Sequence, residues 1–330
     1  MAVVTNTVTT HLPMVGMREE LADMIYRLSP EETPLMTMIG RSSVKTTHPE
    51  WMIDELAVPG ANAQPEGNEW TFQAQEQPTR VGNYTQISDK RIIVSRTADK
   101  TDKAARSSEL ARLLKKRGIE LKQDMEFTLL SNQASVAGAL NTARQSAGLP
   151  AWITTNTPRG AGGADGGFNA TTGIVDAATV GTLRAFTKAL LDEALSLAYS
   201  AGGDVKFAMM SPYNKGIFSA FAGIATLRSE VKGENQATIY AGADTYVGDF
   251  GTLTVVPNRV MAGSAALARR VILVDPDHAS VGIFDDIKQY EAAKTGDAEK
   301  RALVVEYTLR VDNEAAFASV EDVFGLTAST

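Results

Sequence analysis

The most regular hydrophobic pattern in the chain lies at residues 102–132. Leucine and methionine recur there at spacings of four and seven residues, at Leu110, Leu114, Leu121, Met125 and Leu129. This period fits one face of an α-helix far better than it fits a strand. We therefore predict a helix of roughly thirty residues, about 45 Å long, which is capped by Asp102 and buried along one face.

The polar side of this helix carries two charged pairs one turn apart, Lys116 with Glu120 and Lys122 with Glu126. Such pairs are predicted to support the helix. Gly118 interrupts it at a cost of about 1 kcal/mol relative to alanine. We interpret Gly118 as a position where another backbone packs closely. Taken alone, the segment is also typical of a core helix in any soluble protein.

Strand patterns at residues 44–56 and 81–97 precede the helix and flank a polar run, AVPGANAQPEGNEWTFQAQEQPTR. Its prolines and glycines predict a long two-stranded protrusion. An extended hairpin buries too little apolar surface to offset chain entropy, so something must support it. Further upstream, residues 1–16 are expected to form an arm that is ordered by a partner, and two short helices follow, ending at Gly40.

Downstream of the helix, residues 133–178 are rich in Ala, Gly, Thr and Asn and include PRGAGGADGG. This run lacks the GxxxxGK[ST] pattern of a phosphate loop, so we interpret it as a flexible connector. Residues 179–201 predict a second helix. The remaining patterns predict a mixed α+β region and alternating strands. The second helix has an apolar face at Leu183, Phe186, Leu190, Ala194 and Leu197, and the last strand has one at Leu303, Val305, Tyr307, Leu309 and Val311.

Composition narrows the class of protein. The 330 residues are 44% hydrophobic and 22% charged, which is enough for a sizeable core in one large domain or two smaller ones. Because there is no cysteine, disulfides and cysteine-ligated metals are excluded. No apolar run approaches a membrane span. A net charge of −7 argues against nucleic-acid binding over the whole surface.

Candidate catalytic groups are few. The three histidines, His11, His48 and His278, are far apart in sequence, and no closely spaced ligand set accompanies them. Residues 249–251 spell the DFG triplet of kinases, but the other kinase motifs are missing, and the context favours a hairpin turn. We therefore predict no catalytic, cofactor-binding or metal-binding residue and no enzymatic activity.

Charge is distributed unevenly along the first third of the chain. Residues 46–79 contain six acids and no Lys or Arg, whereas residues 80–122 contain twelve Lys or Arg against five acids. We hypothesise that the acidic protrusion of one subunit lies over the basic region of the next, with charge setting the register. The alternative is screening of two solvated faces within one chain. The candidate contact residues are Glu50, Asp54, Glu55, Glu66, Glu69, Arg91, Arg96, Arg112, Lys115, Lys116 and Arg117.

The order of these segments resembles a known family. The resemblance is carried by SPEETPLMTMIG, VGNYTQISDKRIIVS, LARLLKKRGIELKQDMEFTLLSNQAS, AGLPAWI, SPYNKGIFSAF, VGDFGTLTVVPNR, VDPDH and AAKTGDAEKRALVVEYTLRVDNEAAFA. In this series the chain resembles the major capsid proteins of tailed bacteriophages of the SU10-like group (Caudoviricetes), over nearly its whole length. The resemblance implies an α+β protein with the HK97-type capsid fold.

Carried over by segment, the resemblance implies five regions. They are an N-terminal arm at 1–45, an extended E-loop at 46–95, a peripheral P-domain at 96–170 with a spine helix at about 102–132, an axial A-domain at 171–270, and C-terminal strands at 271–330 that return to the P-domain. The implied function is self-assembly into the hexamers and pentamers of an icosahedral phage head that encloses double-stranded DNA, formed in the cytoplasm of the bacterial host.

The implied partners are further copies of the chain, a portal and a decoration protein, with no membrane and no cofactor. Some relatives carry a scaffolding segment before the arm, and this chain starts at the arm, so a separate scaffolding protein is expected. Contact with DNA is expected to be non-specific and on the interior. Two alternatives stay open: an encapsulin-like nanocompartment shell with the same fold, and an enzyme with an unrecognised site.

Overall fold

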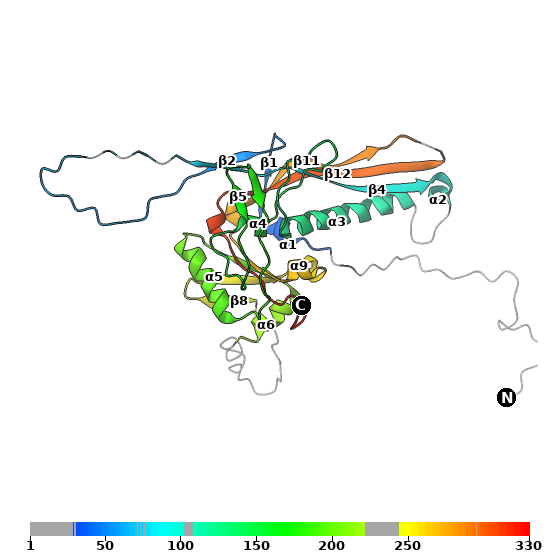
Figure 1. Ribbon diagram of the computed structural model, residues 1–330. Coiled ribbons are helices and arrows are strands. Elements are labelled where there is room, and N and C mark those ends of the chain that lie inside the picture. Colours follow the sequence, from blue (N-terminus) through cyan, green and yellow to red (C-terminus); the bar gives the residue numbers. More distant parts are fainter. Residues whose placement is uncertain are drawn as a thin grey trace, which may run out of the picture.

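The computed structural model describes residues 29, 31–70, 72, 74–75, 77–101, 108–221, 244–294 and 296–330 (Figure 1). Two larger sheets organise this part of the chain, together with two small hairpins. The first sheet has the strand order β1-β11-β12-β4, formed by Gly40–Ser43, Ala279–Glu291, Ala298–Val311 and Gln86–Ser95. Its three long strands are antiparallel, whereas β1 runs parallel to β11.

The long helix α3 (Glu109–Leu130) lies along β4 and β12 of this sheet (Figure 1). The C-terminal part of the predicted apolar stripe is confirmed: Leu121, Met125 and Leu129 are buried in one cluster with Tyr307 and Leu309 of β12. Leu110 and Leu114, nearer the start of the helix, are only half-buried. Alternation along β12 turns these side chains to the helix side of the sheet. Burial against the sheet therefore holds the helix in place.

The helix is shorter than the predicted range of about 102–132. Asp102 lies outside the described residues, and the helix begins at Glu109, where the Ser108 hydroxyl accepts a hydrogen bond from the Ala111 N–H at 3.2 Å. The carboxylate of Asp99, on the preceding helix α2 (Arg96–Lys100), accepts the Glu109 N–H at 2.8 Å. These two caps fix the start of α3 at Glu109, which an uninterrupted hydrophobic period does not reveal.

Part of the predicted arm belongs to the core. Helix α1 (Pro34–Met38) starts after Thr33 and buries Leu35 and Met36 against α3, and β1 then joins the first sheet. Residues 34–43 of the range 1–45 that the resemblance assigns to the arm therefore pack within the subunit, because Leu35, Met36 and Ile39 are buried there. The first of the two short helices that we predict after residue 16 covers residues 17–28, which lie outside the described residues.

The predicted protrusion is confirmed. Strands β2 (Glu50–Ile53) and β3 (Thr79–Gly82) pair in an antiparallel hairpin, and the chain between them extends away from the rest of the molecule (Figure 1). The following strand β4 carries the hairpin into the first sheet. The hairpin root is thus anchored, while its loop projects outward.

Residues 133–178 are not the flexible connector that we predicted. Helix α4 (Leu149–Trp152) is buried, and β5 (Gly167–Asn169) pairs with β6 (Ile174–Asp176). The glycine-rich run packs tightly because the Asp322 carboxylate accepts the Gly160 N–H at 3.0 Å, and a β-carbon at Gly160 would lie 2.1 Å from the Thr182 carbonyl oxygen. Glycine permits this close approach.

The second sheet has the order β13-β10-β7-β9-β8. Its strands are β13 (Ala318–Val320), β10 (Val271–Val274), β7 (Phe207–Met210), β9 (Gly251–Pro257) and β8 (Thr245–Gly248). The helices of this region are α5 (Lys188–Ser200), α6 (Pro212–Ser219), α8 (Arg259–Ala262) and α9 (Ala265–Ala268). Two 3-10 turns lie at Pro276–His278 and Glu314–Ala316. Residues 249–250 form a tight turn, as expected.

Two expectations about this region are corrected. Strands β10 and β13 join the second sheet, so residues 271–330 do not return as one unit to the first sheet; only β11 and β12 do so. In α5 the buried face is Leu191, Ala194, Leu195 and Ala198, and Leu197 is exposed. The helix starts at Lys188 after the Thr187 cap, which sets a face rotated from the predicted stripe.

Candidate assembly interface

The root of the hairpin is fixed by a buried asparagine. Asn83 follows β3 directly and is fully buried. Its Oδ1 accepts the Ala147 N–H at 2.9 Å, and its Nδ2 donates to the Leu309 carbonyl at 2.8 Å and to Ser146 Oγ at 3.2 Å. One side chain thereby joins the hairpin to β12 and to the segment after α3. A fully paired buried amide specifies a single geometry.

A second polar contact supports the same root. Thr85 Oγ1 donates to Glu306 Oε1 at 2.6 Å, and Arg144 Nη2 donates to the same oxygen at 2.6 Å. The Arg144 and Glu306 side chains are both largely buried, at 27% and 13% exposed. The hairpin therefore starts from a rigid base.

The loop between β2 and β3 has the opposite character. Leu56, Trp70 and Phe72 are 98%, 82% and 91% exposed, and Val58 is 89% exposed. Solvent-exposed apolar side chains gathered on one segment mark an interaction surface. These four positions are the apolar part of a candidate interface between subunits.

The predicted acidic residues divide between the root and the loop. Glu50 forms an ion pair with Arg80 at 3.4 Å within the hairpin. Asp54 accepts the Glu55 N–H at 3.1 Å, at the start of the loop. Glu66 and Glu69 are exposed and form no ion pair with any described residue. The loop acids are therefore free to meet charges on another chain.

The predicted basic residues mostly have acidic neighbours in the same chain, from outside the hairpin loop. The pairs are Arg91 with Asp89, Arg96 with Asp297, Arg112 with Glu109, Arg117 with Glu120 and Lys116 with Glu120. Lys115 is exposed and forms no ion pair with a described residue. Exposed pairs contribute only about 0–1 kcal/mol, so these cations can exchange partners on assembly. The structure does not bring the hairpin acids and these cations together within one subunit.

Gly118 does not adjoin another backbone within the subunit. A β-carbon built there meets no described atom within 4 Å. The close packing that we predicted is therefore absent from the described part of the chain. A crossing by a neighbouring subunit stays a prediction.

Glu126 is a site that sequence reasoning misplaced. Lys122 was expected to pair with it, but Glu126 is fully buried and accepts the Leu35 N–H at 2.8 Å, the Met36 N–H at 2.9 Å and Asn258 Nδ2 at 2.9 Å. Burial raises the pKa of Glu126 above its ordinary value, and these three hydrogen bonds oppose that rise. Its position next to Met125, on the apolar side of the helix, is the feature of the sequence that could have indicated that Glu126 is buried.

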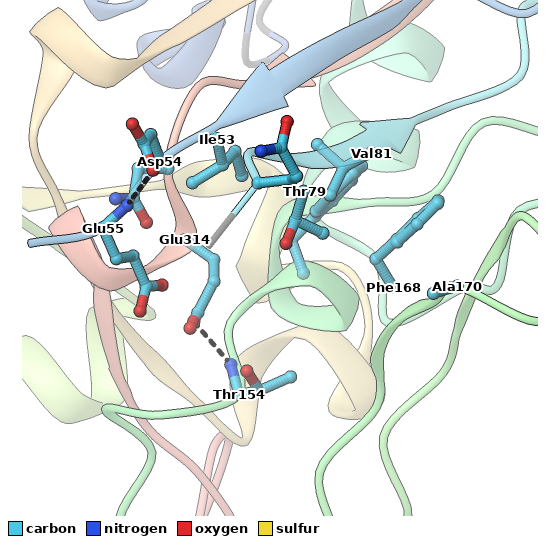
Figure 2. A pocket seen from close by; sticks show the side chains of 12 residues that line it. Ile53, Asp54, Glu55, Thr79, Val81, Thr154, Phe168, Ala170 and Glu314 are labelled. Carbon is cyan, nitrogen blue, oxygen red and sulfur yellow. Dashed lines mark hydrogen bonds between the residues drawn. The ribbon is translucent and has the colours of Figure 1, made fainter. Parts of the chain in front are cut away.

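A cleft of about 380 Å³ opens beside the hairpin root (Figure 2). Three carboxylates, Asp54, Glu55 and Glu314, line it together with apolar and aromatic side chains that include Trp152 and Phe168. We call it the hairpin-root cleft. No lysine or arginine lines it. It is an acidic recess at the point where the protrusion leaves the body.

Among the described residues, no group of three or more His, Asp or Glu side chains is placed to hold a metal ion. None of the helices in the described ranges is long and apolar enough to cross a membrane. The features that stand out are thus an anchored hairpin, an exposed apolar loop and unpaired surface charge. All three concern contact with other chains.

Comparison with known proteins decides the family. The family model described as SU10 major capsid protein matches residues 3–324. The chain belongs to this family. The major capsid protein of Escherichia phage Phieco32 is 28% identical over 340 residues, covering 91% of this chain and 93% of the relative. The protein is accordingly a phage major capsid protein, a structural component of the virion and not an enzyme.

Solved structures show the same fold for the capsid protein. The Cyanophage A-1(L) capsid matches with a TM-score of 0.65 at 14% identity, covering 96% of this chain and 99% of the other. The SrpI encapsulin of Synechococcus elongatus PCC 7942 matches with a TM-score of 0.54 at 10% identity, over 95% of each chain. The HK97-type fold is common to both, and the family match favours the phage capsid over the encapsulin alternative.

Proposed function

We propose that this capsid protein self-assembles into hexamers and pentamers of an icosahedral head that encloses double-stranded DNA. The main support for this proposal is the anchored hairpin, whose loop exposes Leu56, Val58, Trp70 and Phe72 to solvent. A subunit gains stability when a neighbour covers such a surface. Many weak contacts of this kind per subunit make a closed shell persistent while still permitting error correction.

The proposed contact places the hairpin loop of one subunit over the basic helix region of the next. Among the described residues, Glu66 and Glu69 form no ion pair, and Lys115 on α3 is an exposed cation that likewise forms none. Complementary charge sets register and speeds encounter more than it adds affinity. The arm, E-loop, P-domain and A-domain assignments belong to the same proposal, with the boundaries corrected as described above.

The proposal includes partners that the family resemblance implies. These are a scaffolding protein, a portal and a decoration protein, with assembly in the host cytoplasm. Packaged DNA would meet the shell only through non-specific contacts between cations and phosphates, which weaken steeply with salt.

Electron microscopy of the chain expressed with the other head proteins tests the proposal. Wild-type chains should give closed polyhedra, and the double variant Glu66→Lys with Glu69→Lys should leave folded, unassembled subunits. The double variant Glu193→Lys with Asp249→Lys makes the same change in net charge at exposed positions outside the hairpin and should assemble. Normal polyhedra from the hairpin variant at low salt would contradict the proposed contact.

A further inference from the structure

Strand β11 is covered by a neighbouring strand along only part of its outer edge. Strand β1 pairs with residues 280–283 of β11, and the Val44 N–H donates to the Ile283 carbonyl at 3.1 Å. Beyond this point β11 continues to Glu291, with no strand of the described chain on that side. Its register with β12 is also irregular between Ile283 and Lys288. A strand edge left open in this way can pair with an added strand.

A groove of about 250 Å³ lies beside this open edge, between α1, α3 and β11. Its apolar lining consists of Met36, Met125, Ile283 and Ile287. Methionine side chains adapt to the shape of an apolar group that binds against them. The groove therefore suits an apolar side chain carried by an added strand.

The groove also carries positive charge. Arg41 from β1 and Lys122 from α3 line it, against one acid, Asp286. Both cations are exposed, and neither forms an ion pair with a described residue. The carboxylate of Asp286 accepts the Ile287 N–H at 2.8 Å. An extended segment that combines apolar and acidic side chains would match this surface in both shape and charge.

The hairpin loop has this combination of side chains. Trp70 and Phe72 are 82% and 91% exposed and stand two positions apart, so in an added strand they would point to the same side. Glu66 and Glu69 precede them and form no ion pair with a described residue. In its own subunit the loop extends away from the body (Figure 1). A contact between loop and groove therefore joins two copies of the chain.

We propose that residues 66–72 of one subunit add to the open edge of β11 in a second copy, with an aromatic side chain in the groove and the loop acids near Arg41 and Lys122. This inference rests on the proposed self-assembly and names the surface that receives the hairpin loop. Because loop and groove are different surfaces of one chain, the contact is head-to-tail, and such contacts close into rings when the rotation between subunits permits.

Because the chain has no cysteine, introduced thiols report this contact without background from the chain itself. A chain with both Glu69→Cys and Lys122→Cys is expressed with the other head proteins, and its particles are treated with a short bifunctional maleimide. Denaturing gels should show a ladder of linked chains, because every subunit carries both partners. The control chain with Glu69→Cys and Tyr199→Cys, which uses an exposed position on α5, should give no ladder.

Charge exchange gives an independent readout. The variant Arg41→Glu with Lys122→Glu should lower the assembled fraction about tenfold or more, because like charges then face each other. Adding Glu66→Lys and Glu69→Lys to this variant should restore assembly. Particles that form without the ladder, or a fourfold variant without recovery, would overturn the docking assignment alone.

Three other outcomes also decide the matter. A ladder from Glu69→Cys with Lys115→Cys, and none with Lys122→Cys, would place the loop nearer the start of α3; it would overturn the groove assignment and leave the proposed function intact. Linking of Lys122→Cys to a different head protein would assign the groove to that protein and overturn the proposal. Failure of the wild-type chain to form closed polyhedra with the other head proteins would overturn the proposed function, and this docking with it.

Discussion

The carboxylate of Glu126 accepts a hydrogen bond from the side-chain amide of Asn258 at 2.9 Å, fully buried on both sides. Asn258 in turn caps α8, with its Oδ1 accepting the Val260 N–H at 2.8 Å. Because Glu126 also accepts two N–H groups from α1, one carboxylate ties the spine helix to the N-terminal segment and to the second sheet. It is the polar junction of the subunit.

Glu126→Ala should destabilise the subunit strongly. The change leaves the Leu35 N–H, the Met36 N–H and the Asn258 amide without an acceptor, and an unsatisfied buried donor costs about 1–3 kcal/mol. Denaturant unfolding of unassembled subunits measures this loss. Lys122→Ala, one turn away and exposed, is the control and should change the free energy of unfolding by less than about 0.5 kcal/mol. Equal effects of the two changes would contradict the junction role.

The same residue gives a signed pH dependence. Its pKa is higher in the folded subunit than in the unfolded chain, so the folded state binds the proton more readily. Its contribution to the free energy of unfolding is therefore fully present below the unfolded pKa and is lost as the pH rises through the folded pKa. The stability of the wild type relative to Glu126→Gln, measured across this window, should fall with rising pH. A flat or rising difference would be inconsistent with the raised pKa.

Leu35→Ala should cost about 2–5 kcal/mol of subunit stability, because it opens a cavity at a fully buried position. Thr37→Ala lies on the exposed side of the same short helix and should change stability little. Unfolding of unassembled subunits distinguishes a core segment from an arm. If Leu35→Ala impaired only particle formation, residues 34–43 would be an arm after all.

Gly118 separates effects on folding from effects on assembly. Gly118→Ala meets open space and should stabilise the unassembled subunit by up to about 1 kcal/mol through helix propensity. Gly118→Leu should fold as well, and it should reduce particle yield if a neighbouring subunit crosses there. Lys115→Leu, at an exposed position of the same helix, is the size control. A normal yield of particles from Gly118→Leu would contradict the prediction that a neighbouring subunit packs against Gly118.

The periodic segments were predictable because burial acts on every third or fourth residue of a helix and every second residue of a strand. The stripe at Leu121, Met125 and Leu129 and the alternation through Tyr307 and Leu309 are both confirmed. The hairpin was predictable from the prolines and glycines that lie between its two strands. Those signals are local, and no distant contact is needed to read them.

Only the tertiary structure decided the rest, since it depends on groups far apart in the chain. Ser108 and Asp99 set the start of α3, and Asp322 makes the glycine-rich run a packed segment. Strand β10 pairs with β7 on one side and with β13 on the other, across long stretches of sequence. From its spacing, Glu126 was expected to pair with Lys122 on the surface of the helix. Its carboxylate oxygens instead accept hydrogen bonds from Leu35, Met36 and Asn258, which are ninety or more positions away in the sequence. The sequence by itself determined which apolar residues are buried, because their spacing is a local property. The hydrogen-bond partners of the buried polar groups were decided only by the tertiary structure, because those partners are distant in sequence.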